Sequence, residues 1–327
     1  MASFRFHGNR WQARIRRKGY PEITDSFSSK LDAERWARAV ESEMDKGQFA
    51  ENIKTQQITL KEIILRFVQE VTPTMKSAKE DAIRLRAIAR KPISSWSLTK
   101  ISSSRIAEYR DLRLNEVSAG TVNRELAYLS SIINHARREW GITIQNPVQQ
   151  VRKPTSPPGR TRTLSKDEGI NLLVSLEPLG RRSPWTYPIV MLALETAMRR
   201  SELLALRWEN IDLKRQTAFL PDTKNGSSRK VPLTSTAVGV LNKLPRSISG
   251  IVFPVKYFTL DAAFKRAVKR AGLIDFRFHD LRHTAISKMA EKLPNLIELS
   301  AVTGHKSLSM LKRYYHPDAE ALAKKLG

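Results

Sequence analysis

The sequence contains no cysteine, which excludes disulfide bonds and thiolate metal ligands. It has no apolar run near the roughly 18 residues that a membrane-spanning helix needs, and no signal-peptide hydrophobic region. It also lacks a GxxxxGK[ST] loop for binding nucleotide phosphates. These absences are consistent with a protein of a reducing cytoplasm that works without ATP.

Acidic side chains are scarce relative to basic ones. Lys plus Arg number 57 against 32 Asp plus Glu, which gives a net charge of +25 and a pI of about 10.5. The excess is spread along the chain: residues 1–58 carry 11 basic and 8 acidic side chains, 59–153 carry 17 and 9, and 154–327 carry 29 and 15. Such a positive potential attracts polyanions, so we expect several surfaces that face nucleic acid.

The first 27 residues predict a small sheet. Three short, turn-bounded runs alternate aromatic or aliphatic residues with basic ones. Ser29, with Asp32 three residues later, predicts the start of a helix that Gly47 ends. The basic face of this sheet could lie in a DNA major groove, or it could be only a solvated edge. The candidate DNA contacts here are Arg14, Arg16 and Arg17.

Residues 59 to about 151 predict a bundle of four or five helices. Thr59 and Glu62 have the spacing of a capping box, and the last predicted helix, 121–141, has one apolar face. Its other face carries basic residues and His135. The candidate DNA contacts in this part are Arg124, Arg137, Arg138, Arg152 and Lys153.

Residues 146–163, NPVQQVRKPTSPPGRTRT, are rich in proline and basic residues. This composition predicts a semi-extended linker that belongs to no core and marks the main domain boundary. A basic linker of this length could cross a DNA duplex and let two domains grip it from opposite sides.

The second half is predicted to be mixed but mostly helical. Ser165 with Glu168 predicts a helix start, PIVMLALETAM a buried helix, and Ser201 the start of another. A hairpin with an Asn225-Gly226 turn follows, then a helix over 257–272 and further helices. The predicted fold class is therefore mainly α with small β-sheets (α+β).

Groups able to bind and attack an anion follow one another in this half. Arg199 lies between two predicted helices, and Lys224 lies on the hairpin. Arginines suit the two non-bridging oxygens of a phosphate, whereas a tyrosine needs help to lose its proton at neutral pH. We therefore hypothesise that a tyrosine attacks a DNA phosphate. The remaining candidates are His279 and Arg282 on one helix face, His305 after Gly304, and Tyr314.

These motifs resemble a known family. ETAMRRSELLALRW, TKNGSSRKVPL, HDLRH, TGHKSLSMLKRY and the Tyr-x-His ending resemble, in this order, the tyrosine site-specific recombinases, or phage-integrase family. Their detail is closest to shufflon-type invertases and phage-type integrases, although Ala197 stands where the family commonly has glycine. The resemblance implies four parts: an arm-site DNA-binding domain (1–58), a helical core-binding domain (59–153), a basic linker (154–163) and a catalytic domain (164–327).

The resemblance also implies that the protein recombines mobile DNA by integration, excision or inversion, and it implies a role for each site residue. Tyr314 would be the nucleophile that forms a 3′-phosphotyrosine, Arg199 and Arg282 would clamp the phosphate, and Lys224 would be the general acid. His279 and His305 would bind the phosphate or take the phenolic proton, and Glu202 would support Arg199. No metal ion or other cofactor is implied. The implied partners are double-stranded DNA, three further copies of the chain, and accessory DNA-bending or directionality proteins at the bacterial or phage nucleoid.

Three alternatives are open at this stage. HDLRH resembles the HExxH helix of zinc proteases, but it has Asp for Glu, a cation beside the metal and no evident third ligand. A DNA-binding regulator without catalysis would share the charge and the bundle but would not need Lys224, His305 and Tyr314 together. A type IB topoisomerase would share the chemistry, but the arm-domain arrangement would be unusual for it. The tail PDAEALAKKLG predicts an amphipathic helix, which we expect to dock on a neighbouring copy.

Overall fold

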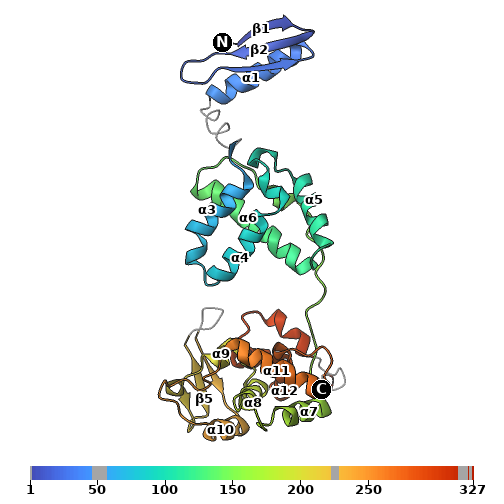
Figure 1. Cartoon of the computed structure of the whole chain (residues 1–327). Helices are drawn as coiled ribbons and strands as arrows, with labels where there is room; N and C mark the ends of the chain where they lie inside the picture. The colour runs from blue at the N-terminus through green and yellow to red at the C-terminus, as the bar shows by residue number, and fades with distance from the viewer. Residues whose placement is uncertain (1, 46–56, 222–227, 316–322, 324–325) are drawn as a thin grey trace. The chain divides into compact units, whose positions relative to one another are not determined.

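The computed structural model describes residues 2–45, 57–221, 228–315, 323 and 326–327. The chain divides into two compact units, Met1–Pro158 and Gly159–Gly327 (Figure 1). Among the described residues, no helix combines the length and the apolar character needed to cross a membrane.

A three-stranded antiparallel sheet begins the first unit. Strands β1 (Ala2–His7), β2 (Arg10–Ile15) and β3 (Ile23–Phe27) pair in that order, and α1 (Lys30–Asp45) covers one face (Figure 1). Ser29 accepts a hydrogen bond from the Asp32 amide at 3.1 Å, so the predicted helix start is confirmed. The predicted stop at Gly47 lies outside the described residues.

The pairing register places the arginines of this sheet on one face. Ser3 lies opposite Arg14 and His7 opposite Arg10, while Ile15 is buried against α1. Because side chains alternate along a strand, the arginines of β1 and β2 project from the face away from α1. This confirms the predicted basic face, which consists of Arg5, Arg10 and Arg14.

Four α-helices and short 3₁₀ turns form the bundle that follows. The Thr59–Glu62 capping box is confirmed. The apolar face predicted for the longest helix is also confirmed, because Leu126, Ile132 and its other apolar members are fully buried. His135 does not belong to the basic face, because its ring packs edge-on against Phe67 and Trp140. The helices are α3 (Leu60–Glu70), α4 (Ala78–Ala89), α5 (Ser103–Leu114) and α6 (Ala119–Glu139).

The prediction that residues 146–163 belong to no core is wrong for their first third. Pro147–Gln150 form a 3₁₀ helix that Asn146 caps by accepting from the Val148 amide at 3.1 Å. The Asn146 amide donates to Ser130 Oγ at 2.8 Å, and Val148 and Val151 are buried in the bundle core. Buried Pro147, Val148 and Val151 and the hydrogen bonds of Asn146 attach this segment to the core.

The second unit is mostly helical around one small sheet. The sheet order is β4 (Ile211–Asp212), β5 (Thr217–Leu220) and β6 (Arg229–Pro232), all antiparallel. The predicted hairpin is confirmed in its strands, whereas Lys224 and its Asn225-Gly226 turn lie outside the described residues. The first helices are α7 (Lys166–Leu176), α8 (Thr186–Thr196), α9 (Arg200–Leu204) and α10 (Ser235–Asn242).

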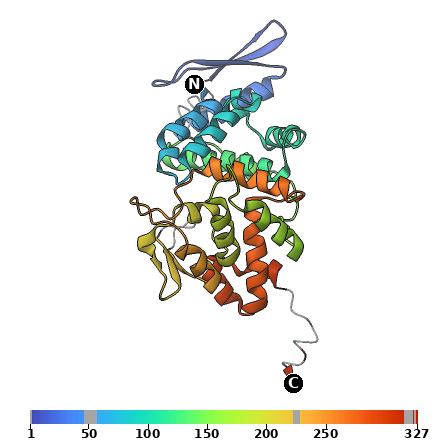
Figure 2. The same ribbon diagram turned by 60° about the horizontal axis from the view of Figure 1, so that its bottom comes forward.

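Helix α8 lies at the centre of this unit. It packs against α10, and against α12 (Phe278–Lys292) along much of its length (Figure 2). Its buried residues include Ile189, Val190 and Leu192, as its continuous apolarity predicted. The other helices are α11 (Tyr257–Arg270) and α13 (Leu296–Thr303), followed by the 3₁₀ turns η6 (Leu308–Met310) and η7 (Lys312–Tyr314). The predicted tail helix falls mostly outside the described residues.

Candidate active site

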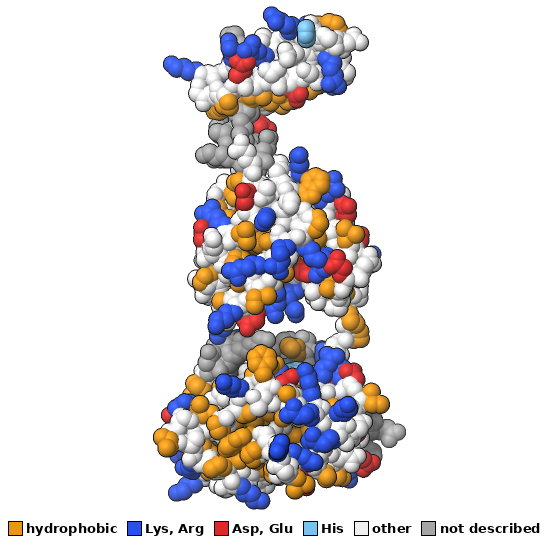
Figure 3. All heavy atoms as spheres, in the orientation of Figure 1, with side chains coloured by type: hydrophobic (Ala, Val, Ile, Leu, Met, Phe, Trp, Pro, Cys, Tyr) orange, Lys and Arg blue, Asp and Glu red, His pale blue; other side chains and the backbone are white. Residues whose placement is uncertain are grey.

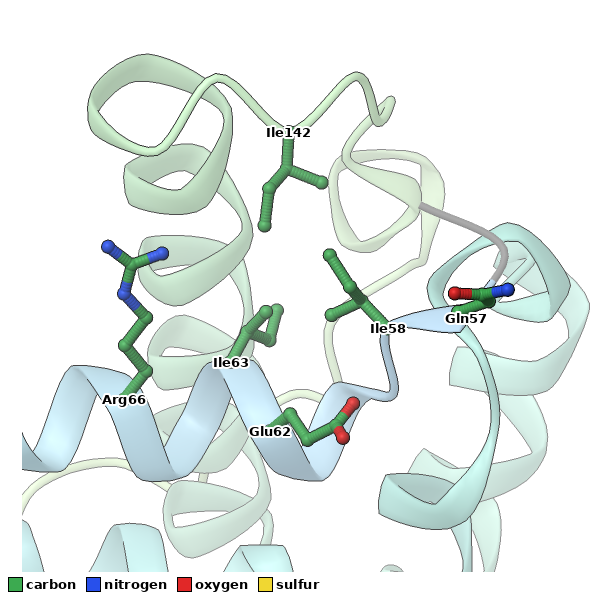
Figure 4. Close-up of a pocket in the computed structure, with 6 residues that line it drawn as sticks. All are labelled: Gln57, Ile58, Glu62, Ile63, Arg66 and Ile142. Carbon is green, nitrogen blue, oxygen red and sulfur yellow. The ribbon is translucent and has the colours of Figure 1, made fainter. Parts of the chain in front are cut away.

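A cavity in the bundle contains none of the expected catalytic residues. It has a volume of about 450 Å³, and Ile58, Ile63 and Ile142 point into it (Figure 4). Its charged residues already have structural partners: Glu62 caps α3, and Arg66 lies 4.3 Å from the Trp140 ring. The candidate chemistry lies in the second unit.

Arg199 and Glu202 form the first side of the candidate site. Arg199 precedes α9, and its Nη1 donates to Glu202 Oε1 at 2.8 Å, as expected for a supporting carboxylate. Arg229 of β6 binds the same carboxylate through two nitrogens, at 3.0 and 2.8 Å. These arginines lower the pKa of Glu202 to about 2, although burial alone would raise it. Glu202 therefore stays ionised and fixes both guanidinium groups.

Arg282 occupies the middle of the site and is 3% exposed. Its Nη1 donates to the Ala197 carbonyl at the end of α8, and its Nη2 donates to the Thr303 carbonyl at the end of α13, at 2.7 Å. Burial is the main reason that its pKa falls to about 10, and the charge on Arg199 lowers it further. Arg199 and Arg282 are thus two cations held close together, and a bound anion would relieve their electrostatic repulsion.

His305 lies beside Arg282 because Gly304 turns the chain. Gly304 has φ 69°, and a Cβ there would come within 2.9 Å of the Arg229 guanidinium. The Thr303 hydroxyl donates to the Leu299 carbonyl, so His305 Nδ1 donates to Thr303 Oγ1, at 2.7 Å. The other ring nitrogen, Nε2, accepts from Arg282 at 3.5 Å. Burial and the neighbouring arginines lower the His305 pKa to about 4, so the ring is neutral at pH 7.

Tyr314 enters the site from η7 and meets a histidine that the sequence did not assign. Its hydroxyl is hydrogen-bonded to His283 Nδ1, and the two rings lie 27° from parallel with centroids 5.8 Å apart. Burial raises the pKa of Tyr314, which the charges on Arg313 and Arg282 counteract. Tyr315 makes no such contact among the described residues, so the geometry favours Tyr314 over its neighbour.

His279 is exposed on α12 and presents its ring edge-on to His283, with centroids 5.2 Å apart. The described part of the chain holds no group of three or more His, Cys, Asp or Glu side chains placed to bind a metal ion.

The structure thus brings together Arg199, Arg282, His305 and Tyr314. The sequence motifs did not assign Arg229 and His283 to the site. The available signals were the basic residue on the second strand of the hairpin and the second histidine of HDLRH, but neither pattern indicates which side chain it meets.

The residues expected to contact DNA all belong to the first unit, and Figure 3 shows Lys and Arg side chains on the surfaces of both units. In the bundle, Arg124, Arg137 and Arg138 are exposed on α6, and Arg152 and Lys153 are exposed beyond it. Arg14 and Arg16 share Glu22, and Arg17 pairs with Asp45 at 2.5 Å. Because they already have counter-charges, the N-terminal arginines have less free charge to offer than those on α6.

Two family models match the chain. The phage integrase family matches residues 162–321, and the N-terminal domain of phage integrases matches residues 56–154. The shufflon-specific DNA recombinase of Escherichia coli is 40% identical over 282 residues, which cover 84% of this chain and 73% of that protein. A Haemophilus influenzae protein described as an integrase/recombinase is 35% identical, over the whole of this chain and 91% of its own length.

Solved structures show the same fold. The Tn1549 transposon integrase superposes with a TM-score of 0.68 at 17% identity, over 83% of this chain and 99% of that one. A lambda integrase chain gives 0.64 at 21% identity, over 93% and 95%. The chain therefore belongs to the phage integrase family and is a tyrosine-type site-specific recombinase.

Proposed function

We propose that Tyr314 is the nucleophile of this recombinase and that it attacks a DNA phosphate held by Arg199 and Arg282. The observation that carries the proposal is the hydrogen bond between the Tyr314 hydroxyl and His283 of α12, the residue that follows buried Arg282. Arg282 and Tyr314 also influence each other's pKa, so phenol and guanidinium share one electrostatic environment.

The surrounding groups fit phosphoryl transfer. Arg199 and Arg282 stabilise the charge that develops on the pentavalent transition state, a role that fixed donors can fill without a metal ion. His305 would bind a phosphate oxygen after taking up a proton, because the negative charge of the phosphate raises its pKa. By resemblance to the family, His279 contacts the phosphate or the phenol, and Lys224 protonates the leaving 5′-oxygen. The 3′-phosphotyrosine conserves the bond energy, so rejoining needs no ATP.

We further propose how the parts share the work. Residues 1–58 bind arm sites, and residues 59–153 bind the core site. Residues 154–163 cross the duplex and link the core-binding domain to the catalytic domain, residues 164–327, which cleaves the DNA. The basic face of the first sheet and the exposed arginines of α6 support the two binding roles. A lambda integrase tetramer is known on a Holliday junction, and four copies of this chain would likewise exchange two duplexes, with accessory proteins, on the nucleoid of a bacterial cell.

A covalent trap tests the nucleophile. The full chain is incubated with nicked duplexes taken from DNA that flanks its own gene, and SDS-stable protein–DNA adducts are counted. We expect an adduct with the wild type and with Tyr315→Phe, and none with Tyr314→Phe. EDTA should not change the yield. A full yield from Tyr314→Phe would overturn the assignment, and a yield lost in EDTA would show that a metal takes part.

A further inference from the structure

His283 is a buried titratable group to which the proposed roles give no task. It is 9% exposed, and it follows Arg282 directly on α12. Adjacent residues of a helix point about 100° apart, so one turn can present a phosphate clamp in one direction and an imidazole in another. Arg282 reaches Ala197 and Thr303, whereas His283 reaches the Tyr314 hydroxyl.

We propose that His283 Nδ1 accepts the phenolic proton of Tyr314 as the tyrosine oxygen attacks phosphorus. This inference rests on the proposed role of Tyr314. Neither His279 nor His305 is placed as well for the task. His279 lies against the His283 ring, and the two ring nitrogens of His305 are engaged with Thr303 and Arg282.

The hydrogen bond has a preferred direction. Burial lowers the pKa of His283 and raises that of Tyr314, so both groups are neutral near pH 7. The charged or titratable groups that face His283 are His279, Asp280 and Arg282 on α12, Arg313 and Tyr314 on η7, and His305 after α13. Of these, Asp280 alone favours a protonated ring. In the proposed transfer the neutral ring is the tautomer protonated at Nε2, in which the phenol is the donor and Nδ1 the acceptor.

The proton therefore stays on the phenol until a phosphate is in place. When the tyrosine oxygen bonds to phosphorus, its proton passes to His283 Nδ1 and leaves an imidazolium. The bond from phosphorus to the 5′-oxygen breaks, and the leaving oxygen keeps the electron pair and takes a proton from the general acid, assigned to Lys224. Rejoining reverses each transfer: the 5′-hydroxyl attacks, and His283 returns its proton to the departing phenol.

Two substitutions separate proton transfer from positioning. His283→Phe fills the space without an acceptor. His283→Asn keeps an acceptor oxygen near the place of Nδ1 but cannot take up a proton. We expect both to slow single-turnover cleavage by about 10²- to 10⁴-fold, the usual contribution of a general base. Glu291→Gln, an exposed change on the same helix, should leave the rate unchanged.

The pH profile gives an independent readout. Wild-type cleavage should rise with pH as His283 loses its proton, and this limb should disappear in His283→Asn while His279→Asn and His305→Asn keep it. A substrate with sulfur in place of the leaving 5′-oxygen needs no general acid. It should restore cleavage by Lys224→Ala but not by His283→Asn.

The outcomes distinguish this inference from the proposed function. An adduct formed by Tyr314→Phe would overturn both. No adduct with Tyr314→Phe, together with a wild-type rate or an unchanged pH limb in His283→Asn, would overturn only the role of His283. Melting temperature and DNA gel shifts identify a variant that fails to fold. In that case the role of His283 is tested with whichever of His283→Phe and His283→Asn folds, and with the substrate that has sulfur in place of the leaving 5′-oxygen.

Discussion

Arg229 and Glu202 face each other as a two-point ion pair inside the second unit, with separations of 3.0 and 2.8 Å. The exposed fractions of the two side chains are 10% and 4%. Glu202 also accepts from the side chain and the backbone amide of Arg199. One buried carboxylate therefore positions a proposed phosphate clamp and neutralises a neighbouring strand arginine.

Glu202→Gln should lower both stability and activity. Removing one partner of a buried ion pair leaves an uncompensated charge and typically costs about 3 kcal/mol or more. We expect the unfolding free energy from urea denaturation to fall by about this amount, and adduct formation to fall with it as Arg199 loses its support. Glu209→Gln is the matched control, because its pair with Arg207 is exposed and should contribute less than about 1 kcal/mol.

Arg282→Lys should show that this guanidinium has a structural as well as a chemical role. A single ammonium on a flexible stem cannot reproduce the planar fork that reaches the Ala197 and Thr303 carbonyls. We expect a loss of about 1–3 kcal/mol in unfolding free energy for a carbonyl left unpaired, and cleavage slowed by about 10²- to 10³-fold. A wild-type melting temperature would contradict the structural role. Arg215→Lys, on an exposed turn, should change neither quantity.

Stability should fall as the pH drops from about 6.5 to about 4. The folded protein holds the His305 pKa near 4, below its ordinary value of 6.5, so the unfolded chain binds a proton first across this range. The loss should be on the order of 1–2 kcal/mol, because water partly screens a half-buried ring. His283 acts in the same direction. Urea denaturation at stepped pH should give a shallower decline for His305→Asn; an equal decline would contradict this cause.

Exposed arginines on α6 should contribute to DNA affinity through phosphate contacts. The double variant Arg137→Gln/Arg138→Gln removes two charges that form no ion pair within the described part of the chain, so the slope of log affinity against log salt should fall by about 2. Gel shifts over a salt series measure that slope. Arg84→Gln should change it less, because Asp81 already lies 3.0 Å from that guanidinium. Equal changes would mean that α6 has no special part in binding.

Local patterns predicted the elements of this fold well. Capping boxes at Thr59 and Ser165, the apolar face of α6 and the alternation in the first sheet all depend on neighbours along the chain, and each is confirmed. The core position of Asn146 to Val151 was missed because it depends on contacts with α6 that no local pattern encodes.

The sequence predicted which types of residue form the candidate site, but it did not predict which side chain each of them contacts. His279 and His283 are four residues apart and share one stripe of α12, so spacing alone could not say which meets Tyr314. The packing of η7 decides it. Arg229 was missed for a similar reason, because strand alternation gives its side of the hairpin but not the buried carboxylate of α9 that it meets.

Ala197 ends α8 with φ 52° and no exposed surface, and its carbonyl accepts from Arg282. Left-handed backbone costs an alanine roughly 1 kcal/mol relative to glycine, so the departure from the family's usual residue is not neutral for the backbone. Larger side chains would meet both the same backbone cost and a filled interior. The range of residues that variation or engineering could place at 197 is therefore narrow, and Ala197→Gly is a candidate for a more heat-tolerant enzyme.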